Sequence, residues 1–207
     1  MRSTAESQRA RATASAVRVF ARTGYHATPV TSVAAEAGIS AAYVFRLFTD
    51  KLGLFVAALE HCFEQVRAAL DEGAEQATGT SPEEVLEAMS VAYARLVADK
   101  DLLMLQVHAQ SACDVPEVRD ALQEGLASVV RLVQQRSGAD DAAVQRFIAY
   151  GQLCHLIVTS GLDGLNTSWA KALTTGMTHV EPTPAPGPAR ARRAPVARTR
   201  KTAPASA

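Results

Sequence analysis

Apolar residues recur at helical spacing along most of this chain, and almost no stretch alternates between apolar and polar residues with a period of two. Hydrophobic residues make up 48% of the sequence but aromatic residues only 5%, so alanine, valine and leucine must form most of the core. Alanine and leucine are strong helix formers. The sequence therefore predicts an all-α protein of about nine helices.

Capping residues, prolines and glycines set the expected helix ends. Thr28 is suited to N-cap a helix with Pro29 at its first position, Gly38 ends that helix, and Ser40 caps the next one. Ser81 starts a later helix with a capping box. We expect helices over 8–22, 29–36, 40–48, 52–73, 81–98, 101–112, 116–136, 140–162 and 167–173.

The formal net charge is zero, but the charges are unevenly distributed. Residues 1–51 have a net charge of +4, residues 52–176 of −9 and residues 177–207 of +5. A basic N-terminal segment on an acidic body suggests that this segment meets a polyanion, although scattered surface charge would give the same sums. For the early arginines, Arg2, Arg9 and Arg11, we expect general attraction to phosphate.

Residues 28–51 show a helix-turn-helix pattern, which presents its second helix to the major groove of DNA. Further residues around it follow one family pattern: Ala16, Val19, Phe20, Gly24, Tyr25, Thr28, Val30, Val33, Ala34, Ala37, Gly38, Ile39, Ser40, Val44, Phe45, Phe48, Lys51 and Leu54. Through these residues the segment 8–66 resembles the N-terminal domain of the tetracycline-repressor (TetR) family of bacterial regulators.

The resemblance implies a three-helix DNA-binding domain over 8–66, with the helix-turn-helix at about 29–48, and a helical ligand-binding and dimerisation domain over 67–176. The implied protein is a homodimeric regulator, a repressor released from a palindromic DNA operator by a small-molecule effector, with the dimer formed through about 140–173. Residues 177–207 are rich in Pro, Ala and Arg and are expected to be a disordered tail, either attracting DNA nonspecifically or inert.

Expected roles at the DNA follow from residue chemistry. Phosphate contacts fix register, Ala41 and Ala42 offer only apolar contact, for example to a thymine methyl group, and Arg46 is suited either to guanine or to a phosphate. The candidate DNA-binding residues are Thr28, Thr31, Ser40, Ala41, Ala42, Tyr43, Arg46, Thr49 and Lys51.

Two positions depart from the family pattern. Phe45 and Leu47 stand where the family usually has tyrosine and often has histidine, so two phosphate contacts are missing. The Tyr43 hydroxyl is a candidate replacement. These departures also suggest an alternative function, a small-molecule-binding or interaction protein of the same fold with weakened DNA binding.

The resemblance also implies an effector pocket in the second domain. Its candidate lining residues are Tyr93, Leu96, Leu103, Met104, Val107, His108, Ser111, Cys113 and Tyr150, although a stripe of Met and Leu at helical spacing is also typical of an ordinary core. The sequence shows no catalytic set, no metal-ligand spacing and no Gly-rich phosphate loop, so we expect no enzyme activity, metal or cofactor. Three widely spaced cysteines, no long apolar run and no signal-peptide core predict a cytoplasmic protein.

Overall fold

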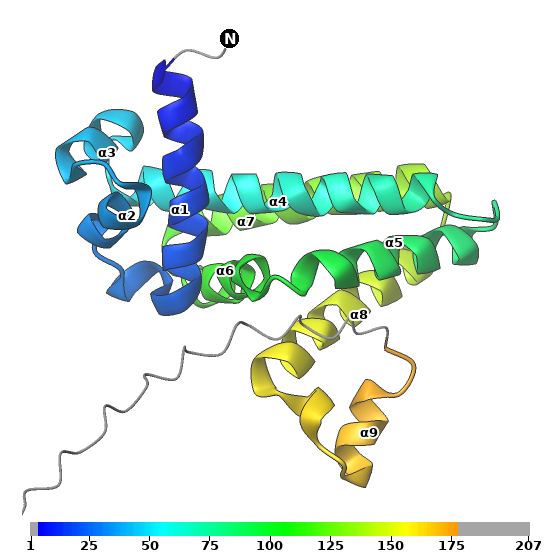
Figure 1. The fold of residues 1–207 in the computed structure, drawn as a ribbon. Helices are drawn as coiled ribbons and strands as arrows, with labels where there is room; N and C mark the ends of the chain where they lie inside the picture. The colour runs from blue at the N-terminus through cyan, green and yellow to red at the C-terminus, as the bar shows by residue number, and fades with distance from the viewer. Residues whose placement is uncertain (1–3, 178–207) are drawn as a thin grey trace, which may run out of the picture.

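Residues 4–177 are described by a computed structural model, in which they form nine α-helices, one short 3-10 helix and no strand (Figure 1). The all-α prediction is confirmed, whereas the predicted tail lies, apart from Met177, outside the described residues. The helices are α1 (Thr4–Ala27), α2 (Val30–Ala37), α3 (Ala41–Phe48), α4 (Lys51–Glu75), α5 (Pro82–Val97), α6 (Lys100–Ser111), α7 (Pro116–Ser137), α8 (Asp141–Ser160), η1 (Leu162–Gly164) and α9 (Ser168–Thr174).

The helices are arranged as a small head and a longer body. Figure 1 shows α2 and α3 beside α1 at one end of α4, while α4, α5 and α7 run along the body and α8 and α9 project from its side. We call α1 to α3 with the first turn of α4 the head, and the remaining helices the body. Helix α6 lies where the body meets α1, so it joins the two parts.

The first helix is longer than predicted and contains a break. It begins at Thr4 and continues to Ala27, but Gly24 has φ 71° and ψ 177°, which is not helical. The helix expected over 8–22 therefore ends just before this break, and one more turn follows it. A side chain at this position would be strained, because this backbone region is open almost only to glycine.

The start of α2 corrects one prediction. Pro29, not Thr28, is the N-cap residue, and it provides no side-chain cap. Thr28 is only 1% exposed, and its hydroxyl donates to the carbonyl oxygen of Gly24 at 2.6 Å. The kink at Gly24 leaves that carbonyl without a helical hydrogen-bond partner. The Thr28 hydroxyl therefore bonds to the Gly24 carbonyl oxygen instead of capping α2.

Other caps are confirmed. Ser40 accepts a hydrogen bond from the backbone nitrogen of Tyr43 at 3.2 Å and starts α3. Ser81 and Glu84 form the predicted capping box at the start of α5. Gly38 ends α2 in the left-handed conformation, with φ 66°. These caps satisfy backbone groups that helix ends leave without partners.

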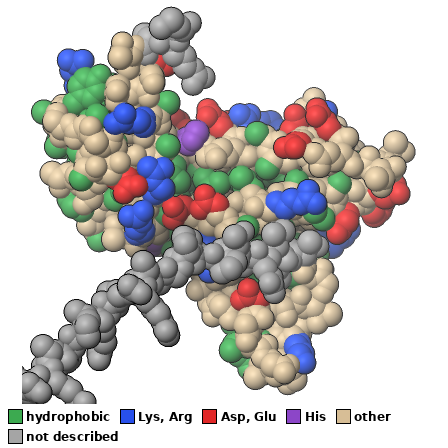
Figure 2. All heavy atoms as spheres, in the orientation of Figure 1, with side chains coloured by type: hydrophobic (Ala, Val, Ile, Leu, Met, Phe, Trp, Pro, Cys, Tyr) green, Lys and Arg blue, Asp and Glu red, His purple; other side chains and the backbone are tan. Residues whose placement is uncertain are grey.

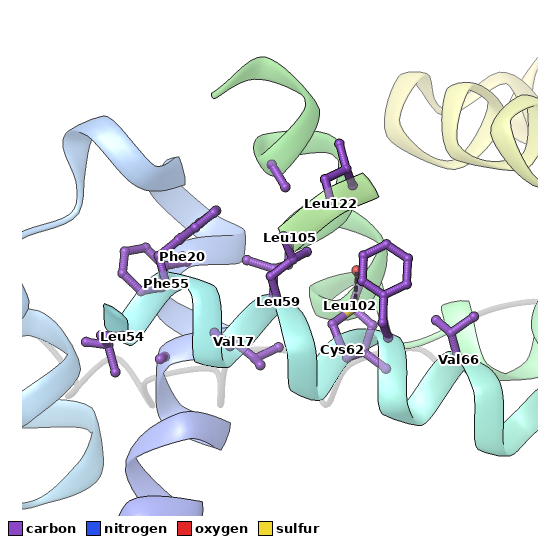
Figure 3. Packing of buried hydrophobic residues seen from close by; sticks show 14 of the residues in the cluster. Val17, Phe20, Leu54, Phe55, Leu59, Cys62, Val66, Leu102, Leu105 and Leu122 are labelled. Atoms are coloured by element: carbon purple, nitrogen blue, oxygen red, sulfur yellow. Dashed lines mark hydrogen bonds between the residues drawn. The ribbon is translucent and has the colours of Figure 1, made fainter. Parts of the chain in front are cut away.

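One continuous apolar core extends through the head and the body. Figure 3 shows Phe20 of α1 against Phe55 of α4, with their ring centroids 4.8 Å apart and nearly perpendicular. Further along α4, Leu59 lies beside Leu105 of α6. The domain boundary predicted near residue 66 therefore falls inside α4, a helix to which both parts contribute packing.

Candidate nucleic-acid interface

Helix α3 has one buried face and one solvent-exposed face. Val44 and Phe48 are buried against the core. The residues exposed on the opposite side are Ala42, Phe45, Arg46 and Thr49. Their spacing of three, one and three residues forms a single stripe along the helix. We call these four residues the α3 stripe, and it is the surface that α3 can present to another molecule.

The turn before α3 holds this stripe away from the body. Gly38 takes a left-handed conformation, and Ile39 packs against the core from a half-buried position. At the other end of α2, Thr31 and Ser32 are exposed. The helix-turn-helix therefore presents short hydroxyl side chains next to the α3 stripe, on a scaffold whose buried side is apolar.

Two arginines of α1 secure the ends of the short helices. Arg11 donates from Nε to the carbonyl oxygen of Ala37 at 3.1 Å, and also from Nη2. Arg9 donates to the carbonyl oxygen of Leu47, and its guanidinium lies 4.4 Å from the ring centroid of Phe48. Both carbonyls lie in the last turn of a helix, where a cation is favourable. The expectation of general phosphate attraction at Arg9 and Arg11 missed this structural role.

Other basic side chains of the head are also engaged within the protein. Arg18 and Arg22 share Glu36, with nitrogen–oxygen distances of 2.9 and 3.8 Å. Lys51 donates from Nζ to the carbonyl oxygen of His26 at 3.0 Å, and partial burial lowers the pKa of Lys51. In this arrangement Lys51 holds the end of α1 against the start of α4.

Arg46 differs from these residues. Its guanidinium carbon lies 4.7 Å from the ring centroid of Tyr43, one turn earlier on α3. Within residues 4–177, no carboxylate or carbonyl oxygen accepts a hydrogen bond from Arg46. Its charge is therefore exposed with its hydrogen-bond donors available to a ligand.

The structure brings most predicted DNA-binding residues to one surface. Exposed are Thr31, Ser40, Ala42, Arg46 and Thr49, whereas Ala41, Tyr43 and Lys51 are half-buried. Thr28 is the exception, because its hydroxyl faces its own chain. Phe45 is 46% exposed and was missed as a surface residue of the site, although its position three residues after Ala42 indicates the same stripe.

The surface charges follow the division into head and body. Figure 2 shows several Lys and Arg side chains over the end of the molecule that carries α1, α2 and α3, and the body carries many of the Asp and Glu side chains together with further Lys and Arg side chains. This distribution favours the approach of a polyanion to the head and disfavours its approach to the body.

The body contains a cavity of about 280 Å³ among α4, α5, α6, α7, α8 and the residues that follow α9. Of the nine predicted lining residues, Tyr93 and Tyr150 line it, and the others do not: Leu96, Leu103, Met104, Val107, His108, Ser111 and Cys113. Its other lining residues are mainly apolar: Phe63, Val66, Leu70, Glu87, Ser90, Ala94, Gln106, Leu126, Val129, Phe147, Ile148, Gly151, Gln152, Cys154, Gly176 and Met177.

The seven predicted residues outside the cavity pack elsewhere, Leu96 and Cys113 against the main core. Met104 and Val107 pack with Leu103 in a small cluster. The His108 ring lies against Gly24, such that a Cβ atom on that glycine would be 2.9 Å from Nδ1. Ser111 donates to the carbonyl oxygen of His108. Helical periodicity predicts which face of α6 is buried, but it does not predict which residues of that face line the cavity.

A neutral polar pair lies beside the cavity, which Tyr93 lines and His155 does not. The Tyr93 hydroxyl is 2.6 Å from Nε2 of His155, a residue that is 4% exposed. Burial lowers the pKa of His155 to about 4 and raises the pKa of Tyr93. Both groups are therefore uncharged at neutral pH, which suits this side of the cavity to an uncharged part of a ligand.

A second apolar feature lies on the outside of the body. Large hydrophobic side chains are exposed at Tyr150, Leu156, Leu165 and Trp169, all within α8, α9 and their connection. We call these four residues the α8–α9 surface. Such side chains on one pair of helices are typical of a protein–protein contact.

The described part of the chain contains neither a membrane-spanning helix nor a metal-binding cluster. No helix between residues 4 and 177 combines the length and apolarity needed to cross a lipid bilayer. No cluster of three or more His, Cys, Asp or Glu side chains there has the arrangement of a metal site.

Comparison with known proteins agrees with this geometry. Residues 12–58 match the family model of bacterial regulatory proteins, tetR family. No curated protein matches the chain. Among solved structures, the transcriptional regulator FadR from Bacillus subtilis in complex with stearoyl-CoA is similar, with a TM-score of 0.64, 18% identity, and coverage of 82% of this chain and 99% of that chain.

Two further structures show the same fold. The fatty acid degradation regulator FadR from Bacillus halodurans has a TM-score of 0.65 and 18% identity, over 87% of this chain and 100% of that chain. A TetR-like transcriptional regulator from Rhodococcus sp. RHA1 has a TM-score of 0.59 and 22% identity, over 84% and 93%. The similarity thus extends through both the head and the body.

Proposed function

This chain has the N-terminal domain and the fold of a TetR-family transcriptional regulator, and we propose that it binds a pseudo-palindromic DNA operator as a homodimer and is released from it by a small-molecule effector. The observation that carries the proposal is the α3 stripe, which stands on a buried apolar scaffold in the most basic part of the described chain. A major groove is wide enough to admit a helix presented in this way.

The proposed DNA contacts divide by chemistry. Thr31, Ser32 and Ser40 have exposed hydroxyl groups suited to phosphate oxygens, as has Thr49 at the far end of α3. Thr28 is not included, because its hydroxyl already donates within the protein. The base-facing part of the interface is then the middle of the α3 stripe.

The proposed dimer forms through the α8–α9 surface, within the predicted range 140–173. A single head makes a small contact with DNA, whereas two heads joined by one body make the second contact nearly intramolecular. Closed two-fold symmetry then requires two half-sites related by the same symmetry. Burying four large apolar side chains would supply the association energy.

The proposed effector occupies the body cavity. Its mainly apolar wall and neutral Tyr93–His155 pair favour a ligand with a substantial apolar part. FadR from Bacillus subtilis has a similar fold and was solved with stearoyl-CoA, so long-chain acyl compounds are the first class to test. Release would follow if this ligand binds more tightly to a dimer whose heads are wrongly spaced for DNA.

The decisive experiment is selection of bound fragments from random DNA with the purified full chain. We expect enrichment of a pseudo-palindrome, and stearoyl-CoA or a fatty acid should lower affinity for it. The Ala94→Phe variant, which fills the cavity, should lose the ligand response and keep DNA binding, while the exposed Ala68→Phe variant should keep both. Both variants need thermal unfolding curves like that of the wild type.

The alternative is an interaction or small-molecule-binding protein with weakened DNA binding. The internal hydrogen bonds of Lys51, Arg9 and Arg11, and the absence of a hydroxyl at Phe45, favour it. Selection that enriches no sequence, together with ligand binding in the cavity, would support this alternative over the regulator.

A further inference from the structure

Arg46 has a position that the other basic side chains of the described head do not share. As described above, Arg9, Arg11, Arg18 and Lys51 donate to carbonyl or carboxylate oxygens of the protein, and Arg22 forms an ion pair with Glu36. Among residues 4–177, Arg46 has no hydrogen bond or ion pair, and its guanidinium carbon lies 4.7 Å from the ring centroid of Tyr43. A cation over an aromatic face keeps the N–H groups at the edge of the guanidinium plane free.

The neighbours of Arg46 restrict how the α3 stripe can distinguish sequences. Ala42 and Phe45 flank it on the exposed face and have no hydrogen-bonding side-chain group. Thr49 lies one turn further, after the end of α3. In the middle of the stripe, Arg46 is thus the side chain that donates hydrogen bonds. A planar fork of donors matches the O6 and N7 acceptors of guanine.

We propose that Arg46 reads one guanine in each half-site of the operator, and that Tyr43 is a positioning residue that holds the Arg46 guanidinium. The inference rests on the proposed function, because it requires that α3 enters a DNA groove. It assigns Tyr43 a role through its ring, which differs from the hydroxyl-to-phosphate contact expected from the sequence.

The main alternative for Arg46 is a phosphate contact, and the two contacts have different signatures. A phosphate contact weakens binding about equally for all sequences when it is removed, and lowers the salt slope by about 1. A guanine contact loses affinity only where the acceptors of that guanine are changed. A chemical change in the DNA therefore separates them.

The test uses the operator obtained by selection, with single guanines replaced by 7-deazaguanine in both half-sites at once. This base lacks the N7 acceptor. We expect one position where the replacement lowers wild-type affinity about tenfold or more. Arg46→Gln should lose that sensitivity, whereas Arg67→Gln, an exposed arginine of α4, should retain it. Equal sensitivity of the wild type and Arg46→Gln at every guanine would overturn the assignment.

The role of Tyr43 is tested in the same assay. Tyr43→Phe keeps the ring, so it should preserve the guanine dependence of the wild type, and Tyr43→Leu should reduce it severalfold. Thermal unfolding checks that both variants fold. An unchanged guanine dependence in Tyr43→Leu would overturn the positioning role. If no operator can be selected, the proposed function fails and this inference fails with it, whereas an operator insensitive to Arg46 overturns this inference alone.

Discussion

The hydroxyl group of Tyr93 lies 2.6 Å from Nε2 of His155, and this contact joins α5 to α8 beside the body cavity. Among the described residues, Nδ1 of His155 is buried without a hydrogen-bond partner. Its low pKa of about 4 follows from this burial.

The stability of the protein should therefore depend on His155 below neutral pH. The unfolded residue binds a proton below about pH 6.5, while the folded residue does so only below about pH 4. The stabilising contribution is complete above pH 6.5 and decreases as the pH falls toward 4, by at most about 3 kcal/mol. Urea unfolding of the wild type and of His155→Gln at several pH values measures this difference.

His61→Gln serves as the control for that series, because His61 is only partly buried, at the surface of α4. It should keep the wild-type pH dependence. If His155→Gln also keeps the wild-type pH dependence, the decrease in stability at low pH comes from carboxyl groups that titrate over a similar range.

Gly24→Ala should destabilise the protein by at least about 2 kcal/mol. The backbone at Gly24 has φ 71° and ψ 177°, and an added Cβ would lie 2.9 Å from the His108 ring. Gly161→Ala is the control for an ordinary left-handed backbone, because its φ is 63° and its ψ 34°, and none of the described residues lies within 4 Å of the added atom. It should lose only about 1 kcal/mol, the left-handed penalty alone. Equal losses by thermal or urea unfolding would contradict an added cost at Gly24 from its backbone conformation and the His108 contact.

Arg11→Met should destabilise the head by about 1 kcal/mol, because the carbonyl oxygen of Ala37 loses its cation partner at the end of α2. Amide hydrogen exchange in α2 measures this locally. Arg67→Met removes an exposed arginine outside the head and should leave α2 exchange unchanged. Unchanged exchange in Arg11→Met would mean that this hydrogen bond adds nothing to the stability of α2.

Trp169 provides a direct probe of the proposed dimer, since it is the single tryptophan of the chain and is 55% exposed. Its fluorescence emission should shift to shorter wavelength as the protein concentration rises through the dimer dissociation constant. Leu156→Glu places a charge on the same surface and should weaken dimerisation at least tenfold, about 1.4 kcal/mol. Sedimentation velocity provides an independent measurement. A wild type that sediments as a monomer at every concentration would rule out this dimer.

Much of the fold follows from local sequence signals. Ser40, Gly38 and the Ser81–Glu84 pair predicted helix ends correctly because each signal acts through its own backbone neighbours. Thr28 shows where such reasoning fails. Its hydroxyl had two possible backbone partners, and the kink at Gly24 determined which one it satisfies.

The sequence predicted which residues make up the candidate site, but not the partner that each of its side chains binds. The exposed face of α3 follows from helical spacing. The partners of Arg9 and Arg11 lie 38 and 26 residues away, so only the folded chain reveals them. The same holds for the cavity, whose wall combines residues from five helices and the segment after α9.

The continuous core of α4 has a consequence for engineering this protein. Phe55 and Leu59 are one helical turn apart, yet the first packs on α1 and the second on α6. A hybrid regulator could join this head, up to residue 66, to the body of another regulator. Its native α4 residues would then pack against an α6 from the other protein, whose side chains do not match them. A functional chimera should therefore include α6 of this protein together with the head, so that the α4 and α6 surfaces that pack against each other come from the same protein.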